Sequence, residues 1–204
     1  MAIGEPDRIR GTVLIVAALN LAYFGVEAAV ALAIGSVALL ADSVDFLEDT
    51  AVNLLIFLAL GWSLRARALM GRVMAGVILL PALAAVWQIV AKVGEPVAPE
   101  PVPLIAAAFG ALVVNGACAL LLVRIRHHGG SMTGAAWLAA RNDVVVNAAI
   151  IVMGLITAWT LSGWPDIVLG AVILVLNATA AREVWRLAQS ERLAARVLAG
   201  EYVD

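Results

Sequence analysis

Long apolar segments occupy nearly the whole of this 204-residue chain, and short runs rich in glycine, proline or arginine separate them. A helix needs roughly 20 apolar residues to cross the hydrocarbon core of a bilayer. Only 14% of the residues are charged, against about 25% in a typical soluble domain. The sequence therefore predicts an all-α membrane protein whose first 190 residues form a six-helix transmembrane bundle, followed by a short tail at 191–204. The expected spans are about 12–34, 37–62, 71–93, 102–124, 133–160 and 166–188.

The basic residues predict how this bundle is oriented. Lysine and arginine collect in cytoplasmic loops, and 11 of the 13 basic residues flank the six spans on one side. Lys92 lies toward the opposite side, and Arg141 lies within the fifth span. We therefore expect both termini to be cytoplasmic, in a multi-pass protein of a plasma or inner membrane.

The composition also excludes several kinds of partner. The formal net charge of −2 leaves no basic surface for nucleic acid phosphates. The single cysteine, Cys118, can form neither an internal disulfide nor a thiolate cluster for a soft metal.

The second span carries four acidic residues within eight positions, although a charged residue near the centre of a membrane helix costs about 2.5–3.5 kcal/mol. At 100° per residue, Asp45 and Asp49 stack one turn apart, and Asp42 and Asn53 continue the same stripe, whereas Glu48 lies to one side. Two stacked carboxylates form half of a site for a hard cation. Alternatively, the stripe lines a hydrated groove or caps a helix near the interface.

The fifth span repeats part of this pattern. Its sequence NDVVVNAA at 142–149 resembles EDTAVNLL at 48–55. The match pairs Asp143 with Asp49 and Asn147 with Asn53. The two spans are the middle members of two three-span halves, so the match is typical of an inverted repeat, whose interface commonly holds the ion site of a transporter. In this register the partner of Asp45 is Ala139, which offers no ligand.

Other polar residues have more open roles. Asn142, Asn147, Asn53 and Asp42 are candidates for additional ligands or for groups that orient the ligands. Glu27 in the first span and Glu48 in the second are candidates for carrying protons, although Glu27 could equally hydrogen-bond to the second span. His127 and His128 are either a metal-capturing pair or two exposed loop residues.

Three stretches of sequence are similar to a known family. The segment GSVALLADSVDFLEDTAVN resembles the second transmembrane helix of the cation diffusion facilitator family. The segments ARNDVVVNAAI and SGWPDIVLGAVIL resemble its fifth and sixth helices. The resemblance implies a six-helix bundle, usually dimeric, that exports divalent cations from the cytoplasm in exchange for protons. It also implies that Asp45, Asp49 and Asp143 are metal ligands.

The chain departs from the family pattern at two points. Members usually carry a histidine four residues before the aspartate of the fifth helix, where this chain has Ala139. An all-oxygen site favours harder ions such as Mn²⁺ or Fe²⁺ over Zn²⁺, but the sequence leaves Zn, Mn, Fe, Co and Cd open. Members also usually end in a cytoplasmic domain, whereas this chain stops about 16 residues after the sixth expected span.

These observations predict a divalent metal transporter rather than an enzyme, most simply a proton-coupled exporter with no permanently bound cofactor. Three close carboxylates repel one another, so an empty site would take up protons that a metal ion then displaces. Its partners would be divalent metal ions, protons, the lipid bilayer and, from the resemblance alone, a second copy of the chain.

Two alternatives come from other classes of protein. A proton-coupled exporter of organic cations would use Glu27. An intramembrane aspartyl protease would use Asp49 and Asp143, but the Gly-x-Gly-Asp sequence typical of those enzymes is absent.

Overall fold

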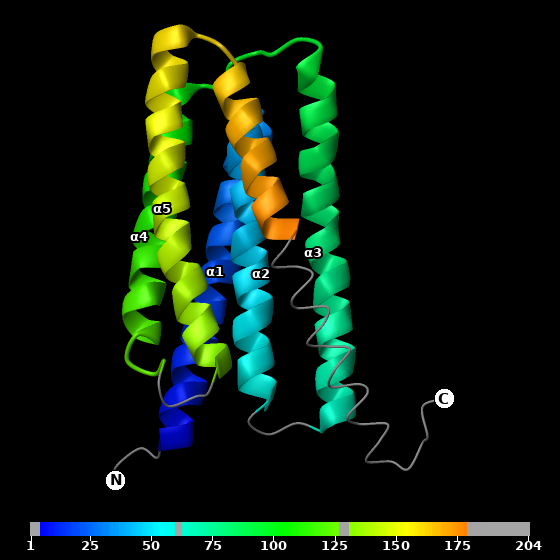
Figure 1. Ribbon diagram of the computed structural model, residues 1–204, viewed down its shortest axis with the longest axis vertical. Helices are drawn as coiled ribbons and strands as arrows, with labels where there is room; N and C mark the ends of the chain where they lie inside the picture. The colour runs from blue at the N-terminus through cyan, green and yellow to red at the C-terminus, as the bar shows by residue number, and fades with distance from the viewer. Residues whose placement is uncertain (1–4, 60–62, 127–130, 179–204) are drawn as a thin grey trace.

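The computed structural model describes residues 5–59, 63–126 and 131–178, and these residues form helices joined by short loops (Figure 1). The expected ends of the second and sixth spans, and both histidines, lie outside the described residues. The helices are α1 (Glu5–Ile34), α2 (Val37–Ala59), α3 (Leu64–Val93), α4 (Pro101–Leu122) and α5 (Ser131–Thr160), followed by a sixth helix, Trp164–Ala178. We call the end of the bundle that contains loops 35–36, 94–100 and 161–163 the three-loop end.

The turn between α1 and α2 is built from a glycine and a serine. Gly35 has a φ of +69°, a conformation that glycine adopts without a steric penalty, and it allows the chain to reverse within two residues. The Ser36 hydroxyl then accepts a hydrogen bond from the backbone N–H of Leu39 at 3.2 Å. This is the usual way in which a serine begins a helix.

The helices surround α2. It packs against α1, α3 and α5, while α4 packs against α5 and α1. Figure 1 shows α1 and α2 near the centre, with α4 and α5 on one side and α3 on the other. The sixth helix packs against the first turn of α2. At Gly170 the two backbones are so close that an added Cβ atom would clash with Val37. The helix with the acidic stripe is therefore the most enclosed part of the fold.

The distribution of polar and apolar side chains is the opposite of that in a soluble protein. Large apolar side chains such as Trp87 and Trp159 are exposed, whereas polar residues such as Asn20, Glu27 and Asn53 are fully buried. In the part of the chain that the structure describes, four helices are long and apolar enough to cross a membrane, namely Asp7–Ile34, Gly76–Val93, Pro101–Leu122 and Thr133–Thr160. The predicted all-α, six-helix membrane fold is thus confirmed.

Gly170 provides a test of the contact between the sixth helix and α2. A Cβ atom at this position would lie 2.8 Å from the carbonyl carbon of Val37 and 2.9 Å from the nitrogen of Ala38. We predict that Gly170→Ala lowers the thermal unfolding midpoint in detergent, since overpacking typically costs about 1–3 kcal/mol. Gly116→Ala on α4, where an added Cβ meets no atom within 4 Å, is the control. Equal midpoints for the two variants would contradict this packing.

Candidate metal site

Asp45 and Asp49 lie one turn apart on the uninterrupted helix α2. The side chain of Asp49 is buried, with 6% of its surface exposed, and that of Asp45 is partly buried. Their carboxyl groups lie close enough to interact electrostatically. Helical periodicity predicted that these two acids stack, and the structure places the stacked pair inside the bundle.

Asp143 of α5 approaches this pair from across the contact between α2 and α5. Its carboxyl group interacts electrostatically with those of Asp45 and Asp49. The described residues contain no group of three or more histidine, cysteine, aspartate or glutamate side chains arranged to hold a metal ion. The three carboxyl groups are thus neighbours, without the convergence of a preformed coordination shell.

The repeated sequence motif has the same local geometry on both helices. The Asn53 side chain donates from Nδ2 to the carbonyl of Asp49 at 2.9 Å. On α5, the Asn147 side chain donates in the same way to the carbonyl of Asp143 at 2.8 Å. Both asparagines are fully buried, and neither amide oxygen has a hydrogen-bond partner among the described residues. Asp49 and Asp143 therefore each have a buried oxygen acceptor one turn further along the helix.

Asn20 of α1, to which the sequence analysis gave no role, contacts one of the candidate ligands. Its Nδ2 donates to Oδ2 of Asp49 at 3.4 Å, and its own Oδ1 accepts a weak hydrogen bond from the Cys118 thiol at 3.7 Å. An amide held in this way orients the carboxylate, as outer groups commonly orient metal ligands. The only signal in the sequence was that Asn20 is polar and seven residues before Glu27.

Glu27 of α1 and Asp42 of α2 form a second acidic pair. Both side chains are fully buried, and their carboxyl groups lie within hydrogen-bonding reach of each other. Within residues 5–59, 63–126 and 131–178, no group donates a hydrogen bond to any of their four oxygens. Two ionised carboxylates in this arrangement would repel each other, so the pair is suited to holding a shared cation or proton.

The remaining two candidates lie at different depths. Glu48 is buried, with 4% of its surface exposed, and interacts electrostatically with Asp49. Asn142 is exposed on α5, and its Oδ1 accepts a hydrogen bond from Arg141 at 3.4 Å. The structure therefore places Glu48 beside the acid pair of α2 but does not bring Asn142 to it.

Comparison with known proteins identifies the family of this helical membrane bundle. Residues 13–190 match the family model of the cation efflux transmembrane domain. No curated protein sequence matches the chain. Because the family match covers most of the 204 residues and all six helices, the chain belongs to the cation efflux family and is an integral membrane protein that transports metal cations.

Proposed function

We propose that this protein exports divalent metal cations in exchange for protons and binds the metal between α2 and α5. The carboxylates of Asp45, Asp49 and Asp143 are the ligands in this proposal, and the amide oxygens of Asn53 and Asn147 are available to complete the shell. The observation that carries the proposal is the approach of Asp143 on one helix to a stacked pair of aspartates on another. Carboxylate and amide oxygens suit divalent cations.

Metal loading would have to draw the three carboxylates together, because they do not converge in this structure. Without a cation, ionised carboxylates at these three positions repel one another. A divalent ion between them attracts all three. Protons held by the empty site would leave as the metal binds. Rocking of helices about a site at their contact would then expose it to the two sides of the membrane in turn.

The chemistry of the ligands favours harder ions. Imidazole is a favoured ligand for zinc, whereas carboxylate and carbonyl oxygens suit manganese and magnesium. Ala139 lies one turn before Asp143 on α5, so the position that would supply a nitrogen ligand carries only a methyl group. We therefore expect Mn²⁺ or Fe²⁺ to compete well with Zn²⁺, Co²⁺ and Cd²⁺.

Glu27 and Asp42 are proposed to carry a proton during exchange. They are buried and face each other across α1 and α2, and no group of the described residues donates a hydrogen bond to them. A pair of carboxyl groups is a poor divalent site, because such ions usually take six or more oxygen ligands. One proton between the two groups would instead give a hydrogen bond and halve the buried charge.

The cellular setting is also a proposal. The asymmetric distribution of basic residues supports cytoplasmic termini, and with them export across a plasma or inner membrane. The family resemblance supports a homodimer. The family match favours metal transport over the organic-cation exporter and the aspartyl protease.

The assigned site is tested by Asp49→Asn. We predict that this change abolishes metal-driven proton flux in proteoliposomes, because it removes one of three carboxylate ligands while preserving side-chain size. Glu100→Gln, at an exposed acid before α4, is the matched control and should keep the flux of the unmodified protein. Unimpaired flux in a folded Asp49→Asn protein would rule out this site.

The role of Ala139 is tested by Ala139→His. A histidine one turn before Asp143 adds an imidazole on the same face of α5, so the ratio of zinc to manganese transport should rise. Transport of each ion is measured separately in vesicles at equal concentrations. A ratio that does not change would show that position 139 does not face the bound metal.

The proton-carrying pair is tested by Glu27→Gln. Glutamine has the same shape but cannot exchange a proton, so fewer protons should move per metal ion while metal affinity stays unchanged. Proton and metal fluxes are recorded in the same vesicles, and affinity is measured in detergent. Loss of metal affinity would instead make Glu27 a ligand, and an unchanged flux ratio would remove it from the exchange.

A further inference from the structure

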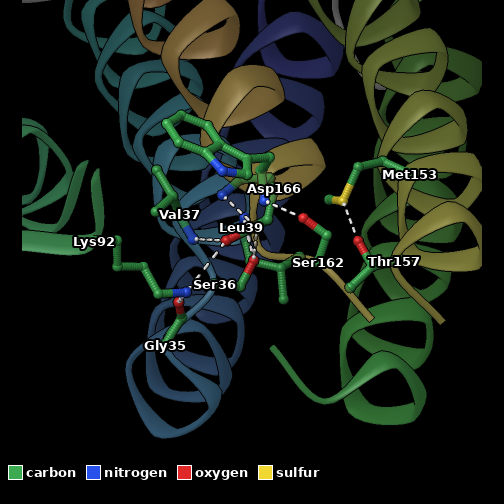
Figure 2. A network of polar contacts seen from close by, with 11 residues as sticks. Gly35, Ser36, Val37, Leu39, Lys92, Met153, Thr157, Ser162 and Asp166 are labelled. Atoms are coloured by element: carbon green, nitrogen blue, oxygen red, sulfur yellow. Dashed lines mark hydrogen bonds and ion pairs between the residues drawn. The ribbon is translucent and has the colours of Figure 1, made fainter. Parts of the chain in front are cut away.

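A further acid, Asp166, is fully buried at the start of the sixth helix, away from the candidate metal site. Its Oδ1 accepts hydrogen bonds from the Ser36 hydroxyl at 2.6 Å and from the Ala38 N–H at 3.0 Å. Its Oδ2 accepts from the Val37 N–H at 2.8 Å. Figure 2 shows this carboxylate at the beginning of α2. Asp166 thus satisfies backbone N–H groups that a helix start leaves without partners.

Lys92, near the end of α3, completes this arrangement. Its Nζ lies 3.6 Å from Oδ2 of Asp166 and donates a hydrogen bond to the carbonyl of Gly35. Both Lys92 and Asp166 are drawn around the same turn in Figure 2. The ammonium group offsets the buried negative charge, as does the positive end of the α2 dipole. Three helices are therefore fixed to one another at the three-loop end.

The sixth helix makes a second polar contact with α2, closer to the acid pair. Nδ2 of the buried Asn177 donates to the carbonyl of Ala41 at 2.9 Å. In an α-helix that carbonyl also accepts the N–H of the residue four positions later, which is Asp45. Asn177 thus hydrogen-bonds to the backbone carbonyl of α2 that also accepts the N–H of Asp45, a candidate ligand.

We propose that Asp166 and Asn177 are positioning residues that set the rotation and height of α2 so that Asp45 and Asp49 face α5. This proposal rests on the proposed function, since it assigns the two acids as ligands. Two contacts at different heights from one rigid helix resist rotation of α2 about its own axis, which a single contact would permit. Neither residue touches the metal in this account.

The test compares metal affinity with stability in the full-length protein in detergent. We predict that Asp166→Asn weakens Mn²⁺ binding by about tenfold, the lower end of the loss seen when groups that orient metal ligands are mutated. Binding is measured by titration calorimetry at a temperature well below the unfolding midpoint. Asn177→Ala should weaken binding in the same direction. Ser162→Ala is the control, because the Ser162 hydroxyl accepts from the Trp164 N–H at the same turn and, among the described residues, forms no hydrogen bond with α2.

Each outcome decides a separate point. If Asp166→Asn and Asn177→Ala lower the unfolding midpoint but bind Mn²⁺ as tightly as the unmodified protein, the two residues serve folding alone and the positioning role is wrong. If Asp166→Asn does not fold, the affinity of Asn177→Ala decides. If the unmodified protein binds neither Mn²⁺ nor Zn²⁺, the proposed function fails and the positioning role with it.

Discussion

The constraint on which this fold depends is the presence of four acids within eight residues of one membrane helix. Each would cost about 2.5–3.5 kcal/mol if it faced the bilayer centre as a charge. The bundle meets this constraint by placing α2 at its centre, where almost every residue from 36 to 51 is buried. The acids then face other helices: Glu27 of α1 lies opposite Asp42, and Asp143 of α5 lies opposite Asp45. The apolar surface of the other helices is left for the lipid.

The contacts of α2 with α1 and with the sixth helix differ in kind from its contact with α5. The Asn20 side chain of α1 and the Asp166 and Asn177 side chains of the sixth helix hold α2 by hydrogen bonds. On α5, by contrast, Asn147 bonds within its own helix, and Asp143 faces the acids of α2. In the proposed function, protons in the empty site or a bound divalent ion would relieve the repulsion between ionised carboxylates of α2 and α5. The contact between α2 and α5 would then depend on what the site holds.

The sequence was informative about features that follow from spacing along one helix. Apolar length predicted six helices, and the 100° periodicity predicted the stacking of Asp45 and Asp49. The repeated motif predicted that Asn53 and Asn147 are equivalent, as their hydrogen bonds show. Pairings between helices were not accessible: Asp166 lies in the first turn of the sixth helix, and its partners lie about 130 residues away in the sequence. Spacing also did not distinguish Asn142 from Glu48: each lies 100° from the adjacent aspartate on its helix, but Glu48 is buried and Asn142 is exposed.

The central claim is that an oxygen-lined site at the contact of α2 and α5 binds the transported cation. Anomalous diffraction from crystals of the protein loaded with Mn²⁺ tests it most directly. The account predicts a single strong peak within coordination distance of carboxylate oxygens of Asp45, Asp49 and Asp143, with these groups closer together than in the empty protein. A peak between Glu27 and Asp42, or ordered Mn²⁺ only at the surface, would contradict it.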